Sequence, residues 1–250
     1  MSQPVDCLIP AAPKDYNKLP YVVEAIRAHV QVETIHIVSP SPTGYGWPGV
    51  VEHRDSQVLP FDRAELPYRP NWTYQQLIKL FQDVTEQDWY LVLDADIVVN
   101  KPLPLWSEVD KPILYLGRDQ NHGPYFEFNK RLLGFGKVYD HSFLSECTLY
   151  NKCLVGDMLA YCELTLDGFW HKLIEIVSVG CCPAESELYG SYVIHEHPDL
   201  YDIRRIKSRL GGKYASHVWT DEEIQRQLQE ARRKDPDAHL ISLHSWEGKA

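Results

Sequence analysis

The chain has 250 residues, of which 44% are hydrophobic and 24% are charged, a composition that indicates a folded globular protein rather than a disordered chain. The formal net charge of −10 excludes the broad basic face that a nucleic-acid partner would need. The six cysteines show no CxxC spacing, the start MSQPVDCLIP lacks the layout of a signal peptide, and no apolar run approaches the roughly 20 residues that cross a bilayer. We therefore expect reduced thiols, no membrane span and a cytoplasmic location.

The beginning of the chain predicts a parallel β-α-β unit. Residues 5–9 form a short apolar strand that ends at Pro10, and apolar residues then recur with helical spacing from about Leu19 to Val30. Residues 34–38 predict a second strand. A right-handed crossover through the helix would make the two strands parallel neighbours in one sheet.

The rest of the chain continues the alternation of strands and helices. The segment 39–70 is rich in proline and glycine, and irregular connections of this length are more often functional than idle. A capping box from Thr73 to Gln76 predicts the start of a helix whose polar face carries Lys79. The further predicted elements are strands at 89–93, 113–116 and 239–243 and helices at 154–161, 168–179 and 220–233, the last opened by a capping box at Thr220 and Glu223. No repeat or linker divides the chain, so we predict a single α/β domain.

Two aspartates follow the apolar strand 89–93 in the stretch WYLVLDADIVVNKP. Asp94 and Asp96 are two positions apart and would share one face of an extended chain, at the edge of an open α/β sheet where ligands bind. Two carboxylates that face one cavity repel each other unless a cation lies between or beside them. Mg²⁺ and Mn²⁺ take carboxylate oxygens and keep open positions for phosphate. The pair therefore predicts a divalent-metal site that could hold a diphosphate.

Other interpretations of the two aspartates stay open. Both side chains could cap backbone amides in a solvated loop at the end of the strand. The sequence DADIV also fits the pattern DxDx[TV] of haloacid dehalogenase-type phosphatases, in which the first aspartate, here Asp94, is a nucleophile. That loop usually ends the first strand of its domain, whereas two predicted strands and about ninety residues precede it here, and no acidic pair follows at the expected place.

Several stretches, taken in order, resemble the GT-A glycosyltransferases. VDCLIPAAPKD, WTYQQLIKL and YLVLDADIVVNKP are similar to the opening half of these enzymes, in which a nucleotide-sugar lies across a Rossmann-like sheet and a DxD motif holds Mn²⁺ against its diphosphate. AESELYGSYVI resembles a segment of a small bacterial and viral polysaccharide-related group. ISLHSWEGK resembles the C-terminal histidine segment that completes the metal shell in several GT-A families.

The resemblance implies a fold and an activity. The fold would be a single GT-A catalytic domain over residues 1–250, an α/β structure with a central, mostly parallel mixed sheet flanked by helices. Residues 1–100 would form the nucleotide-binding half and residues 101–250 the acceptor-binding half. The activity would be that of a hexosyl- or pentosyltransferase that uses Mn²⁺ or Mg²⁺ to move a sugar from a nucleotide-diphosphate sugar to a glycan, a small molecule or another hydroxyl acceptor. A non-catalytic sugar-binding protein on the same fold is a further alternative.

The resemblance also assigns site residues by position. The metal would be held by Asp96 and His244, with Asp94 beside the ribose or a metal-bound water. The implied contacts of the nucleotide-sugar are Pro10, Ala11, Lys14, Asp15, Lys79, Asp94 and Ala95. Simpler alternatives stay open, because Lys14 and Lys79 could be solvated surface lysines and His244 a hydrogen-bonded structural histidine.

An inverting transferase also needs a carboxylate that accepts the proton of the acceptor hydroxyl. Glu185 and Glu187 match the two acids of the resembling group, and we favour Glu185, although Ala184 and Ser186 depart from its pattern. Glu187 could instead stabilise the first turn of a helix. A retaining enzyme would need no such base.

The acceptor side is predicted from the segments 118–128 and 141–150, which mix polar and aromatic residues. Aromatic rings stack on pyranose faces while their polar edges bond hydroxyl groups. The predicted acceptor contacts are His122, Tyr125 and His141.

Overall fold

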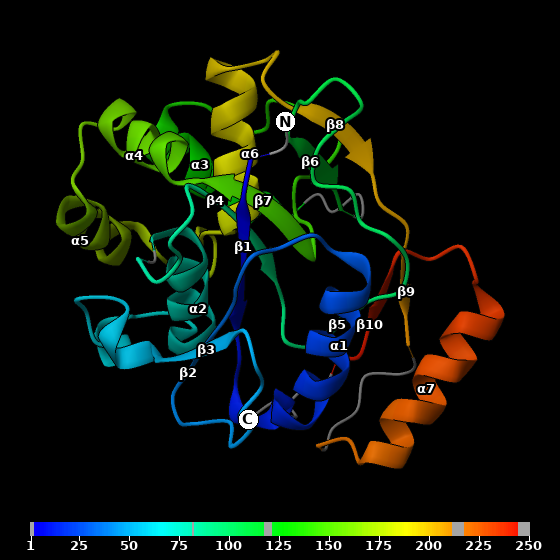
Figure 1. The fold of residues 1–250 in the computed structure, drawn as a ribbon. Helices are drawn as coiled ribbons and strands as arrows, with labels where there is room; N and C mark the ends of the chain where they lie inside the picture. The colour runs from blue at the N-terminus through cyan, green and yellow to red at the C-terminus, as the bar shows by residue number, and fades with distance from the viewer. Residues whose placement is uncertain (1–2, 82, 118–121, 212–217, 245–250) are drawn as a thin grey trace.

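A central β-sheet organises the computed structural model, which describes residues 3–81, 83–117, 122–211 and 218–244 (Figure 1). From edge to edge its strands are β3 (Val50–Arg54), β2 (Ile35–Ser39), β1 (Val5–Pro10), β4 (Trp89–Leu93) and β7 (Cys147–Asn151). The first four strands of this order are parallel, and β7 is antiparallel to β4. The predicted fold class, a mostly parallel mixed sheet flanked by helices, is confirmed.

Helices cover both faces of this sheet (Figure 1). One face packs against α1 (Leu19–His29) and α7 (Asp221–Lys234), and the other against α2 (Pro70–Phe81), α3 (Gly123–Leu133), α4 (Lys152–Tyr161), α5 (Leu166–Ile176) and α6 (Glu185–Glu196). Alternation along each strand separates the two cores, because successive side chains point to opposite faces. In β4, Leu91 and Leu93 join the core of α1 and α7, whereas Tyr90 and Val92 join the core of α2 to α6.

A three-stranded sheet brings a C-terminal segment to the end of β4. Its middle strand β10 (Leu240–Ser242) is antiparallel to β5 (Ile97–Val99) and parallel to β9 (Ser208–Leu210). Beyond the pairing, the backbone N–H of Leu243 donates to the carbonyl oxygen of Asp96 at 2.8 Å. This arrangement sets His244 beside Asp96, the second aspartate of the sequence motif.

The remaining regular elements are short. β6 (Ile113–Leu116) pairs in parallel with β8 (Asp202–Arg205), and three 3₁₀ helices span Pro13–Lys18 (η1), Asp55–Gln57 (η2) and Arg63–Glu65 (η3). Within the described ranges, every helix is too short or too polar to traverse a bilayer.

The start of α2 differs from the prediction. The helix begins at Pro70, a residue favoured in the first turn because no N–H partner is needed there. Thr73 therefore lies inside the helix, where it is buried and its hydroxyl donates to the carbonyl oxygen of Tyr68 at 2.9 Å. The predicted capping box at Thr73 is wrong, whereas the one at Thr220 and Glu223 is confirmed as the start of α7.

A chain of polar side chains crosses three strands of the central sheet. Buried Asp6 on β1 lies 3.5 Å from Nε2 of buried His36 on β2, and Nδ1 of His36 lies 3.0 Å from Nε2 of His53 on β3. Burial lowers the pKa of His36 in spite of Asp6, and burial together with the charge of His36 lowers the pKa of His53. Both histidines are therefore held in the neutral form in the folded protein.

We expect the buried pair His36 and His53 to contribute a loss of stability on mild acidification, opposite in sign to the contribution of His244, whose pKa is raised. The pKa of these histidines in the unfolded chain is about 6.5. Below this pH the unfolded chain binds protons that the folded form does not yet bind, so the free energy of unfolding decreases as the pH is lowered. Urea denaturation at about pH 7.5 and about pH 5.5 measures this effect. The variant His53→Asn should lose less stability between the two pH values than the native protein, and an equal loss would contradict the assignment.

Candidate active site

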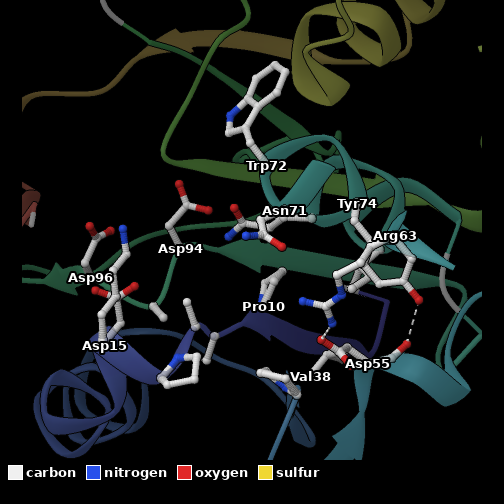
Figure 2. Close-up of a pocket in the computed structure, with 18 of the residues that line it drawn as sticks. Pro10, Asp15, Val38, Asp55, Arg63, Asn71, Trp72, Tyr74, Asp94 and Asp96 are labelled. Carbon is white, nitrogen blue, oxygen red and sulfur yellow. Dashed lines mark hydrogen bonds and ion pairs between the residues drawn. The ribbon is translucent and has the colours of Figure 1, made fainter. Parts of the chain in front are cut away.

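A cavity of about 430 Å³ lies at the carboxyl ends of β1, β2 and β4 (Figure 2). Its volume falls within the roughly 300–1,000 Å³ of small-molecule sites. Its walls are the loop after β1, the segment after β4, the first turns of α2 and the side chain of His244. The cavity thus occupies the edge at which open α/β sheets bind their ligands.

Most of the predicted donor-site residues meet in this cavity. Those that line it are Pro10, Ala11, Lys14, Asp15, Asp94, Ala95, Asp96 and His244. Lys79 and Glu185 are joined to it through Asp94 by a chain of ion pairs. Glu187, His122, Tyr125 and His141 are absent from the lining that the described residues form.

The two aspartates have different partners. Oδ1 of Asp94 lies 2.6 Å from Nζ of Lys79, and Oδ2 of Asp96 lies 3.0 Å from Nδ1 of His244. The chain turns between them, because the N–H of Ile97 donates to the carbonyl oxygen of Asp94 at 3.1 Å. Figure 2 shows Asp96 beside Asp15, with Asp94 apart from both. The separate partners relieve the repulsion that two unpaired carboxylates would suffer.

Lys79 is a buried cation between two acids. Its Nζ lies 2.6 Å from Asp94 and 3.2 Å from Oε1 of Glu185, at the first residue of α6. Burial alone would lower the pKa of Lys79, but the two carboxylates raise it. Burial raises the pKa of Glu185, and Lys79 opposes this shift. The sequence placed Lys79 on a polar helix face, and the structure shows that this face is covered, so the surface-lysine alternative is wrong for Lys79.

His244 lies between Asp96 and a second carboxylate. Its Nε2 is 3.5 Å from Oε1 of Glu146, which also accepts a hydrogen bond from Oγ of Ser242 at 2.6 Å. Burial alone would lower the pKa of His244, but the hydrogen bonds to Asp96 and Glu146 raise it to about 10. Burial raises the pKa of Asp96, but the hydrogen bond from His244, together with the charges of His244, Lys18 and Lys14, lowers it overall. Sequence reasoning missed Glu146, which belongs to no recognisable motif.

The donor atoms of Asp96 and His244 are a carboxylate oxygen, which suits Mg²⁺ and Mn²⁺, and an imidazole nitrogen, which suits transition-metal ions. Their separation of 3.0 Å matches the edge of an octahedron whose ligands lie about 2.1 Å from the ion. No group of three His, Cys, Asp or Glu side chains able to hold a metal occurs among the described residues. Mg²⁺-like ions usually take one or two protein carboxylates and complete their shell with water and substrate phosphates, so a pair of protein ligands fits.

Glu187 has a structural environment. It is buried in the first turn of α6, and one carboxylate oxygen accepts from Oγ of Ser142 at 2.7 Å and from the N–H of Phe143 at 2.8 Å. The prediction that Glu187 is a catalytic acid therefore finds no support in its position, because its carboxylate fixes the loop before β7 and does not line the cavity. Glu185 is the acid of the pair that is linked to the cavity, through Lys79 and Asp94.

The predicted acceptor residues fall into two places. Tyr125 stacks with Trp72, which lines the cavity, at a ring separation of 6.1 Å, and the ring of His122 lies 4.4 Å from that of Tyr125. His141 lies elsewhere, with Arg205 at 2.7 Å from its Nε2. Residues 118–121 of the predicted acceptor segment are outside the described ranges. The structure thus brings His122 and Tyr125 to the rim of the cavity and leaves His141 outside it.

One end of the cavity contains residues that the sequence did not single out. Arg63 forms an ion pair with buried Asp55, and the hydroxyl of Tyr74 donates to the carbonyl oxygen of Asp55 at 3.1 Å. Figure 2 shows this group beside Val38, on the opposite side of the cavity from Asp96. The only sequence signal was the length of the irregular segment 39–70, which indicated function without indicating a residue.

The fold and the cavity define an α/β protein with a ligand-sized site, lined by both acidic and basic side chains, at the carboxyl edge of its sheet. The chain belongs to the family of unknown function DUF6492, whose model matches residues 15–230. No curated protein matches the chain at a significant level. Among solved structures it is similar to the apo structure of WbbM, a bifunctional glycosyltransferase, with 10% sequence identity and a TM-score of 0.46. The similarity covers 100% of this chain and 46% of that chain, so this chain spans less than half of the other's length.

Proposed function

We propose that the protein is a metal-dependent glycosyltransferase that uses a nucleotide-diphosphate sugar as donor. The observation that carries the proposal is the contact of Asp96 with His244 in the cavity at the carboxyl edge of the sheet. The last aspartate of the DxD motif and the C-terminal histidine, 148 positions apart, meet beside the loop that follows β1. Those are three of the sequence features on which the resemblance to GT-A enzymes rests.

In this proposal Asp96 and His244 hold Mn²⁺ or Mg²⁺. The ion, when bound, neutralises the negative charge that grows on the leaving nucleotide diphosphate. Lys14, which also lines the cavity, adds a cationic side chain for the same anionic group. These groups give an acidic protein the local positive charge that binding of a diphosphate requires.

The nucleoside would lie along the loop from Pro10 to Asp15. The Asp55 and Arg63 pair at the other end of the cavity offers one acceptor and one donor group to the edge of a base. The sugar would then lie near Asp94, whose carboxylate is held by Lys79. The acceptor would approach from the rim formed by Trp72.

Glu185 is the acid that we propose as general base if the reaction inverts the anomeric centre. Its Oε1 contacts Lys79, and its Oε2 is buried without a hydrogen-bond partner in the described part of the chain. Such an oxygen retains the capacity to accept the proton of an acceptor hydroxyl. NMR analysis of the product anomer distinguishes the mechanisms, because a retaining enzyme would not need Glu185 as a base.

The proposal is tested with a panel of nucleotide sugars that differ in base and sugar, each with and without Mn²⁺. We expect at least one donor to raise the thermal unfolding temperature only when Mn²⁺ is present, because binding to the folded form stabilises it. Slow hydrolysis of the same donor should accompany binding. Failure of every donor to bind would overturn the proposal.

Two alternative activities give different results in the same assays. Trapping of Asp94 by beryllium fluoride, without binding of any nucleotide sugar, would support a phosphatase in which this aspartate is the nucleophile. Metal-independent binding of free sugars without donor hydrolysis would support a non-catalytic sugar-binding protein. Either result would replace the glycosyltransferase proposal.

A further inference from the structure

Glu146 lies beside His244 and has no role in the proposed chemistry. It immediately precedes β7, whose first residue Cys147 pairs with Leu93, the residue before the DxD motif. The antiparallel pairing therefore delivers Glu146 to the same end of β4 as the aspartates. There its Oε1 lies 3.5 Å from Nε2 of His244.

The loop that carries Glu146 is held in place from two sides. Glu187 accepts hydrogen bonds from Ser142 and Phe143. Gly117 approaches the loop so closely that a Cβ atom there would lie 1.6 Å from the carbonyl oxygen of Leu144. A side chain at position 117 is thus incompatible with this course of the loop. The position of Glu146 is fixed by the fold rather than by its own side-chain contacts.

The hydrogen bonds around Glu146 show which groups donate. The carboxylate can only accept when ionised, so the Oγ of Ser242 donates to Oε1 at 2.6 Å. The other oxygen, Oε2, is buried and has no hydrogen-bond partner among the described residues. Glu146 therefore keeps acceptor capacity for an N–H group of His244.

The two nitrogens of His244 face different carboxylates. Nδ1 lies 3.0 Å from Asp96, and Nε2 faces Glu146. A histidine that ligates a metal through one nitrogen carries a proton on the other, and a carboxylate that accepts this proton fixes both the tautomer and the ring orientation. Only the tautomer with the proton on Nε2 leaves the nitrogen on the side of Asp96, Nδ1, able to ligate a metal.

We propose that Glu146 is a positioning residue that accepts the Nε2–H of His244 and directs Nδ1 toward a divalent cation shared with Asp96. This inference rests on the metal site of the proposed function. It adds a role for a residue that touches neither the ion nor the substrate. It also gives buried Glu187 a function, since Glu187 anchors the loop on which Glu146 lies.

The test is the affinity of the substrate-free protein for Mn²⁺, measured by calorimetry and by the electron paramagnetic resonance signal of the free ion. Glu146→Ala should weaken binding about 10- to 100-fold, the range seen when a carboxylate behind a ligating histidine is removed. Glu146→Gln keeps an acceptor oxygen and should recover most of this loss. Ser242→Ala removes the other hydrogen bond to Glu146 and serves as the matched control, with little change in Mn²⁺ affinity.

Thermal unfolding of each metal-free variant separates positioning from folding. Glu146→Gln and Ser242→Ala keep the proposal testable if Glu146→Ala fails to fold. Native-like affinity of Glu146→Ala, equal losses in the alanine and glutamine variants, or an equal loss in Ser242→Ala would each overturn the inference. A native protein that binds no Mn²⁺ would overturn the proposed metal site as well, whereas binding that Asp96→Ala abolishes and Glu146→Ala preserves would overturn this inference alone.

Discussion

Asp96→Ala is expected to weaken Mn²⁺ binding at least about 100-fold, because the variant removes one of the two proposed protein ligands and leaves His244 without the carboxylate beside its Nδ1. His244→Ala should have an effect of similar size. Calorimetric titration of the substrate-free protein with Mn²⁺ measures both. In the proposed function the ion links the protein to the diphosphate of the donor, so binding of a nucleotide sugar should fall in parallel.

A surface aspartate provides the control for this experiment. Asp237 forms an exposed ion pair with Lys101, at 2.9 Å, and Asp237→Ala removes the same charge from the protein. Its Mn²⁺ affinity should equal that of the native protein. If Asp96→Ala and His244→Ala also retain native affinity, the metal assignment is wrong.

Lys79→Met is expected to lower the free energy of unfolding by about 3 kcal/mol, near the lower end of the cost of breaking a buried ion pair. The substitution keeps the length of the apolar stem and leaves Glu185 and Asp94 near each other without their shared cation. The lower end applies because the side chain of Asp94 is 32% exposed, so water can partly solvate its charge. Urea denaturation at neutral pH measures the change.

Two further variants decide whether the ion pair is the cause. Adding Glu185→Gln to Lys79→Met removes one of the two uncompensated charges and should restore part of the lost stability, a non-additivity expected of contacting residues. Lys172→Met breaks an exposed pair with Glu175 and should cost less than about 1 kcal/mol. A cost for Lys79→Met no larger than that of Lys172→Met would contradict the buried ion-pair network.

The sequence predicted the frame of the fold because strands β1, β2 and β4 are short apolar runs with clear ends. The motif of Asp94 and Asp96 was noticeable for the same reason, since its two acids interrupt such a run. His244 was linked to the motif only by resemblance, and the pairing of β10 with β5 explains the link physically. Local sequence patterns therefore predicted those strands and aspartates that a single segment of the chain defines.

The missed features depend on segments that are distant along the chain. The sequence pattern places Lys79 on the polar face of a helix. Its burial results from contact with α6 and with the end of β4. Glu146 has no motif, and its place follows from the antiparallel addition of β7 to β4. The failed capping box at Thr73 has another cause, because Pro70 starts the helix one turn earlier. For Lys79 and Glu146, no single stretch of sequence contains this information.

The pairing of β10 with β5 also has a consequence for the order of folding. Asp96 and His244 are brought together by a contact that spans 148 positions, and contacts of long sequence separation slow folding and tend to form late. Strands β1 to β4 are all made before β10 during synthesis from the N-terminus. We therefore expect a nascent chain to acquire the proposed nucleotide-binding surface before the proposed metal ligands meet, so that Mn²⁺ binding, if it occurs as proposed, marks the completion of folding.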